Sequence, residues 1–131
     1  KPRDFRKAQD LIQEERESIA KPFPAEDLTA ALCAVVEAND DPEVVVSKSV
    51  VEILAADLAF MYVKLSEREL LLAFQGGISL NDKFGKSFSN TLIAMQDHVA
   101  KKKGKFMSSH ALAGLAVLSL RREDLIRSEY F

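Results

Sequence analysis

Residues that break regular structure or build covalent scaffolds are scarce in this sequence. Its 131 residues include five glycines, four prolines, one cysteine and no tryptophan. Low glycine and proline contents argue against a turn-rich β-sandwich or barrel and against disorder. A single cysteine cannot form an internal disulfide, which excludes a disulfide-stapled scaffold and favours a reducing, cytoplasmic location.

Long apolar runs and a secretion signal are also missing. No run reaches the roughly 18 apolar residues that a membrane-spanning helix needs, so we expect no membrane partner. The first five residues are mostly charged and lack the apolar core of a signal peptide. A chain that begins at Lys1 rather than at methionine is the start expected of a fragment of a longer protein.

What the sequence does contain is the composition of one soluble domain, with 47% hydrophobic and 29% charged residues. The formal net charge of −2 hides an uneven distribution. Residues 1–24 carry a net charge of +1, residues 25–80 carry −7 and residues 81–131 carry +4. If these segments form opposite faces, the asymmetry favours head-to-tail association or attraction of a charged partner.

Helical periodicity dominates the pattern of apolar residues. We predict an all-α fold, a compact bundle of six or seven helices around a buried central helix at about residues 42–64. The expected helices span residues 3–20, 25–38, 42–64, 66–76, 82–103, 109–119 and 119–127. The helix at 82–103 carries the clearest apolar stripe, at Phe84, Phe88, Leu92, Met95 and Val99.

Local capping signals place several of these boundaries. Asp41 is a favoured N-cap residue, and Pro42 suits the first position of the helix that follows. Ser66 and Glu69 have the spacing of a capping box. The pair Gly76–Gly77 is expected to end that helix, because glycine readily adopts the left-handed conformation of a helix C-terminus.

The N-terminal helix is set apart from the remainder of the chain. Its apolar stripe is narrow, so it needs a surface to pack against, either on its own domain or on another chain. The segment 21–24 contains two prolines and interrupts the helix. We therefore divide the chain into a hinged amphipathic helix at 1–24 and a helical core domain at 25–131.

Small and apolar side chains outside the expected core suggest contacts with a protein partner. They stand on the N-terminal helix, on the side of the second helix that we expect to face outwards and on one side of the central helix: Phe5, Leu11, Ile12, Ile19, Cys33, Ala55 and Ala59. They favour a non-enzymatic interaction or assembly module, acting as an adaptor or regulator and self-associating. Ordinary packing within one bundle remains an equal alternative for these residues.

A second hypothesis is binding to RNA or DNA. The C-terminal part of the chain is rich in basic residues, which are typical of contacts to phosphate: Lys101, Lys102, Lys103, Lys105, Arg121, Arg122 and Arg127. A cluster of lysines just before Gly104 has another explanation, because cations are favourable at a helix C-terminus. No helix-turn-helix, zinc-finger or RNA-recognition motif accompanies the cluster.

Asp57 is the acidic residue with the least ordinary position. On a helical wheel it falls among Val50, Ile53, Leu54 and Met61, so we expect its carboxylate to be partly buried and to need a partner or a raised pKa. Two roles are open for this carboxylate. It would form a structural salt bridge or hydrogen bond, or it would act as a general base or metal ligand.

The remaining polar residues show no pattern of catalysis or metal binding. The two histidines, at 98 and 110, lack the spacing of a zinc site. The sequence therefore predicts no catalytic residue, no metal and no cofactor.

Overall fold

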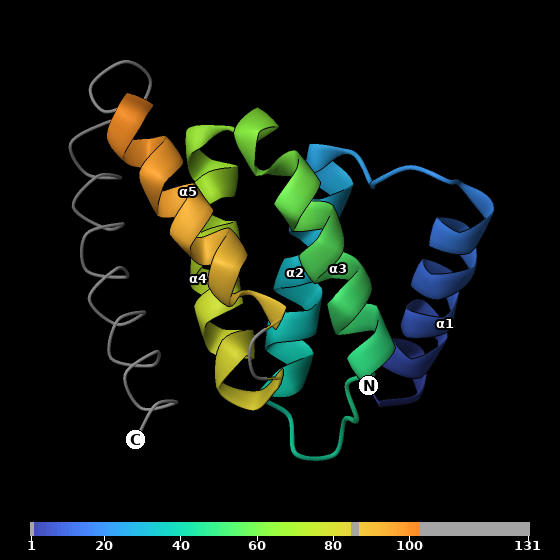
Figure 1. Ribbon diagram of the computed structural model, residues 1–131. Helices are drawn as coiled ribbons and strands as arrows, with labels where there is room; N and C mark the ends of the chain where they lie inside the picture. The colour runs from blue at the N-terminus through green and yellow to red at the C-terminus, as the bar shows by residue number, and fades with distance from the viewer. Residues whose placement is uncertain (1, 85–86, 103–131) are drawn as a thin grey trace.

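The computed structural model describes residues 2–84 and 87–102, and within these ranges the chain is entirely helical (Figure 1). The elements are α1 (Pro2–Ser18), α2 (Ala25–Asn39), α3 (Lys48–Met61), the short 3-10 helix η1 (Tyr62–Lys64), α4 (Glu67–Phe84) and α5 (Ser89–Lys102). The predicted all-α class is confirmed. The helices expected at 109–119 and 119–127 lie outside the described residues, so the full count of six or seven stays a prediction.

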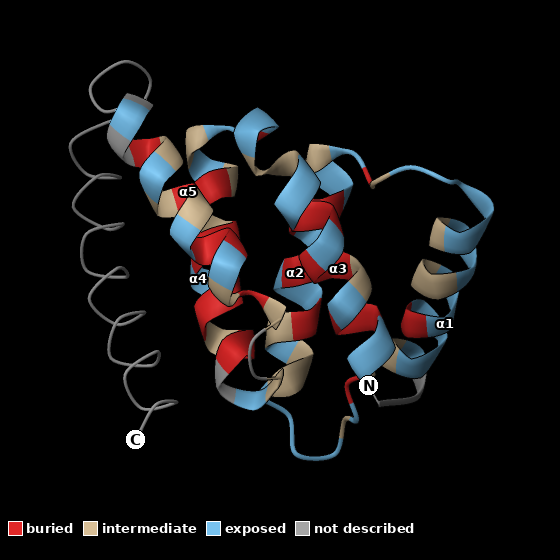
Figure 2. Cartoon of the chain, in the orientation of Figure 1, coloured by how far each residue is buried: buried red, intermediate tan, exposed pale blue. Residues whose placement is uncertain are grey.

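Helices α2 to α5 enclose the hydrophobic core. Helix α2 packs against α3 and α4, α4 packs against α5, and α1 lies on the outer side of α3 (Figure 1). Buried positions are concentrated where α2, α3, α4 and α5 face one another, whereas most of α1 is exposed or half-buried (Figure 2). The largest fully buried side chains include Phe74, Phe88, Leu28, Leu54 and Met95.

The predicted start of the third helix at Asp41 and Pro42 is wrong. Helix α3 begins at Lys48, and residues 40–47 form a loop. The Asp41 carboxylate accepts a hydrogen bond from the backbone amide of Glu43 at 2.9 Å, and the Asp41 carbonyl accepts one from Val44 at 3.1 Å. These bonds close a turn instead of capping a helix, which is the usual way that aspartate competes with helix formation.

The predicted capping box at the start of α4 is confirmed. The backbone amide of Ser66 donates to the Glu69 carboxylate at 2.9 Å, and the Glu69 amide donates to the Ser66 hydroxyl at 3.3 Å. Two backbone donors at the N-terminus of the helix are thereby satisfied reciprocally.

The predicted stop at Gly76–Gly77 is wrong, because α4 continues through both glycines to Phe84. Both residues are buried in contacts between helices. A methyl group added at Gly76 would lie 3.3 Å from the Val36 side chain of α2, and one at Gly77 would lie 2.8 Å from Leu92 of α5. The glycines therefore allow close packing of α4 against its neighbours, which requires no special backbone conformation.

The helix predicted at 82–103 is also shorter than expected, because α5 begins at Ser89. Phe84 belongs to the end of α4, where it is half-buried against the core. The remaining stripe residues are buried as the spacing predicts: Phe88, Leu92, Met95 and Val99. None of the described helices is long and apolar enough to cross a membrane.

The two glycines of α4 should respond differently to alanine. Replacing glycine in a helix interior gains about 1 kcal/mol of helix propensity, and Gly76→Ala should retain much of that gain. At Gly77 the new methyl group would overlap the fully buried Leu92, and overpacking of this kind costs about 1–3 kcal/mol. In urea unfolding followed by circular dichroism, we expect Gly77→Ala to be the less stable variant by about 1–2 kcal/mol. Equal stability of the two variants would contradict the close contact between α4 and α5.

Candidate protein-interaction surfaces

Helix α1 is attached to its own chain by a polar face. Gln9, Gln13 and Arg16 follow one another at helical spacing and face the loop 40–47 and α3. The Gln9 amide nitrogen donates to the Val45 carbonyl at 3.1 Å, and the Ser47 backbone amide donates to the Gln9 amide oxygen at 2.6 Å. One buried glutamine thus pairs with two backbone groups of the loop.

The strongest attachment is an ion pair between Arg16 of α1 and Asp57 of α3. Arg16 Nε donates to both carboxylate oxygens of Asp57 at 3.0 Å. The backbone amide of Phe23, in the linker after α1, donates to Asp57 Oδ2 at 3.1 Å. Asp57 is only 1% exposed, and both of its oxygens accept hydrogen bonds. This geometry makes Asp57 a structural anchor rather than a group open to a substrate.

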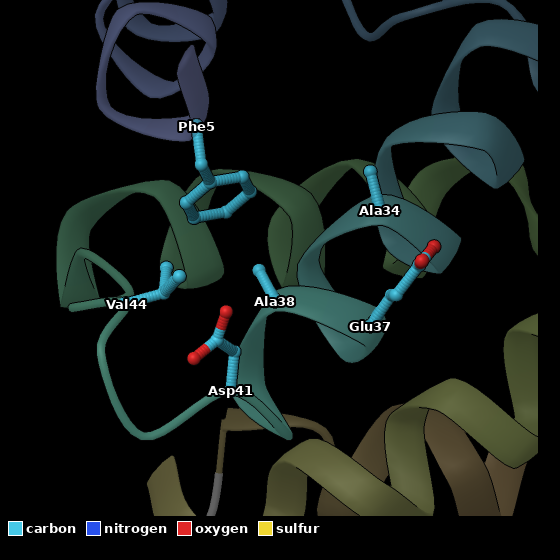
Figure 3. Close-up of a pocket in the computed structure, with 6 residues that line it drawn as sticks. All are labelled: Phe5, Ala34, Glu37, Ala38, Asp41 and Val44. Carbon is cyan, nitrogen blue, oxygen red and sulfur yellow. The ribbon is translucent and has the colours of Figure 1, made fainter. Parts of the chain in front are cut away.

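Because α1 lies on α3, a groove stays open between α1 and the neighbouring α2. One pocket of about 320 Å³ lies at the N-terminal end of α1, where Phe5 points towards Ala38 and Val44 (Figure 3). A second pocket of about 220 Å³ lies further along the same two helices, next to Ile12 and Ala31. We call the surface formed by both pockets the α1–α2 groove. Its lining consists of Phe5, Ile12, Glu15, Phe23, Asp27, Ala30, Ala31, Ala34, Glu37, Ala38, Asp41 and Val44.

All charged side chains that line the α1–α2 groove are acidic. Glu15 and Asp27 belong to one pocket, Glu37 and Asp41 belong to the other, and the lining residues that the structure describes include no basic side chain. The sequence around α2 has the same bias, because residues 22–47 contain six acidic residues and no lysine or arginine. The groove therefore combines an apolar floor with a negative rim.

A second exposed surface lies at the end of α3. Ala56, Ala59, Phe60 and Val63 are all exposed and follow a helical face into η1. Phe60 is 75% exposed and Val63 is 51% exposed. We call these four residues the α3 patch. Large exposed apolar side chains grouped in this way are typical of interaction sites.

The residues predicted from the sequence to contact a partner are divided among several places. Phe5 and Ile12 are half-buried and line the α1–α2 groove, whereas Leu11 is 62% exposed and is not among the lining residues. Ala59 belongs to the α3 patch, but Ala55 is buried in the core and offers no surface to a partner.

The two remaining predicted contacts stand apart from this patch. Ile19 is exposed in the linker after α1. Cys33 is exposed and lines a third pocket of about 290 Å³ between α2 and α4.

Two groups of residues were missed in the sequence. Phe60 and Val63 continue the helical face of Ala59, so the spacing alone could have identified them. Gln9, Gln13 and Arg16 share one face of α1, but polar residues at helical spacing look like an ordinary solvated surface. Only their contacts with α3 and the loop 40–47 show that this face is an internal interface.

The basic residues of the nucleic-acid hypothesis are mostly outside the part of the chain that the structure describes. Lys101 is exposed and Lys102 follows it at the end of α5. The remaining five lie beyond the described residues: Lys103, Lys105, Arg121, Arg122 and Arg127. Within the described ranges no group of three or more His, Cys, Asp or Glu side chains could hold a metal ion.

Comparison of the chain with known proteins finds no match. No family model matches the sequence, and no curated protein or solved structure matches the chain.

Removing only one member of the Arg16–Asp57 pair should cost more stability than replacing both members with apolar residues. Replacing one member of a buried ion pair typically costs about 3–5 kcal/mol, because the other charge is left buried. Asp57 is the deeply buried partner, so Arg16→Met should destabilise the chain by about 3 kcal/mol in urea unfolding. The double variant Arg16→Met with Asp57→Leu should recover part of that loss.

A matched control uses the exposed pair Lys48–Glu52, whose closest N–O distance is 4.0 Å. Lys48→Met should change the free energy of unfolding by less than about 0.5 kcal/mol. An effect of Arg16→Met as small as that of Lys48→Met would show that the pair does not hold α1 against α3.

Proposed function

We propose that this chain is a non-enzymatic interaction and assembly module that self-associates through the α3 patch. The observation that carries the proposal is the exposure of Phe60, a large aromatic side chain in a row of exposed apolar residues. Leaving such a side chain in water forfeits about 1.5–3 kcal/mol that burial would provide. Contact with a second molecule is the simplest way to recover this free energy.

The shape of the α3 patch suits a second copy of the same chain. Ala56 and Ala59 stand beside Phe60 and present little bulk, so a second helix can approach closely. In a two-fold dimer each Phe60 would lie over the alanines of the other copy, because such an interface is self-complementary. The small net charge of −2 adds little repulsion between copies.

The size of the α3 patch limits the strength of this association. Four side chains bury less than the roughly 800 Å² per partner that is usual in a stable interface. We therefore expect a concentration-dependent equilibrium between monomer and dimer. Such weak and reversible association suits an adaptor or regulatory module, which binds and releases its partners.

Sedimentation velocity over a range of concentrations tests this proposal. The average mass should rise above the monomer value of 14.6 kDa towards twice that value. Phe60→Ser should return the chain to a monomer at every concentration, because it removes the largest apolar group of the α3 patch. High salt should not dissociate the dimer, since the contact is apolar.

The matched control is Val45→Ser in the loop 40–47. Val45 is 81% exposed and lies outside the α3 patch, so this variant should associate like the original chain. A chain that stays monomeric at all concentrations would disprove self-association. A loss of association in Val45→Ser equal to that in Phe60→Ser would exclude the α3 patch as its site.

A further inference from the structure

We propose that the α1–α2 groove binds an amphipathic helix with basic flanks, supplied by a partner protein. This inference rests on the groove and its charge, and it is independent of the α3 patch. The occupant would place its apolar face on the floor of the groove and its lysine or arginine side chains over the acidic rim. Such helix-in-groove recognition is a common mode of peptide binding.

The floor of the groove has the chemistry to receive a helix. The α2 wall presents four alanines at helical spacing, whose short side chains leave room for another backbone: Ala30, Ala31, Ala34 and Ala38. The α1 wall presents Phe5 and Ile12. The ten steps from Phe5 to Glu15 rise about 15 Å along α1, which corresponds to nearly three turns of a bound helix.

The rim of the groove selects the charge of the occupant. Glu15, Asp27, Glu37 and Asp41 line it, and no lysine or arginine stands between residues 22 and 47 to neutralise them. An acidic peptide, a nucleic acid or an anionic membrane would be repelled by these carboxylates. A basic helix would gain rim contacts that accelerate association and fix its register.

Leu11 is an exposed apolar residue on the same face of α1 as the lining residue Glu15. It lies one helical turn before Glu15 and is 62% exposed. An exposed leucine beside a rim carboxylate matches an occupant that alternates apolar and basic residues. The half-buried Phe5 and Ile12 would become fully covered by the same occupant, because both line the groove.

Binding of a synthetic helix to the full chain tests the inference. The probe is a fluorescent 14-residue peptide of leucine and lysine, with its leucines at helical spacing. Fluorescence anisotropy should show that this probe binds at least tenfold more tightly than two relatives. One relative carries glutamate in place of every lysine, and the other has the same composition in a scrambled order. Affinity for the lysine probe should fall as salt is raised.

A variant of the chain locates the binding site. Ala34→Trp places a large side chain in the groove and should weaken binding of the lysine probe at least tenfold. Ala34 is exposed, so the fold should persist, and circular dichroism verifies this. Asn90→Trp, at an exposed residue of α5 outside both the groove and the α3 patch, is the control and should leave the affinity unchanged. Phe60→Ser should also bind normally, which separates this inference from self-association.

The charge of the rim has its own pair of variants. Asp27→Asn combined with Glu37→Gln should weaken binding three- to tenfold. Asp10→Asn combined with Glu17→Gln removes the same charge from the outer side of α1, away from the groove, and should have little effect.

Three results would overturn the inference. The first is equal binding of the glutamate or scrambled relative. The second is full affinity in Ala34→Trp. The third is an equal loss of affinity in the two charge pairs.

Discussion

The ion pair between Arg16 and Asp57 determines how the N-terminal third of this protein is arranged. A carboxylate that is 1% exposed is costly unless it is paired, and the Arg16 guanidinium satisfies both of its oxygens. The Phe23 amide adds a third hydrogen bond, so one side chain joins α1, the linker after it and α3. The position of α1 follows from this junction, with Gln9 fixing the middle of the helix against the loop 40–47.

The polar character of this junction explains why some apolar residues of α1 stay partly uncovered. A helix that packs through glutamine and arginine leaves its nearby apolar residues only half-covered. Phe5 and Ile12 therefore border the α1–α2 groove instead of being enclosed in the core. The narrow apolar stripe of this helix is sufficient because hydrogen bonds and an ion pair supply the remaining attachment. The α3 patch and the α1–α2 groove lie on different sets of residues, so the two proposed contacts can operate independently.

Local signals were reliable where the physical cause was itself local. Ser66 and Glu69 form the predicted capping box, because each bonds to a backbone group only three residues away. Asp41 and Gly76–Gly77 misled, because their residue types are compatible with more than one local structure. Asp41 closes a turn as readily as it caps a helix, and glycine fits within a helix where a neighbouring helix comes close.

The sequence by itself determined the helical class, the capping of α4 and the burial of the α5 stripe, since each follows from spacing within a few turns. It also placed Asp57 among apolar neighbours on its helix. It could not identify Arg16 as the partner, because the two residues are 41 positions apart and no periodicity links them. Only the tertiary structure decided that a polar face of α1 would be internal and that two glycines would serve helix packing. It also decided that the predicted contact residues would be divided among the groove, the α3 patch, the linker, a third pocket and the core. Those outcomes depend on which helices contact one another, and these contacts are set by the packing of the whole chain.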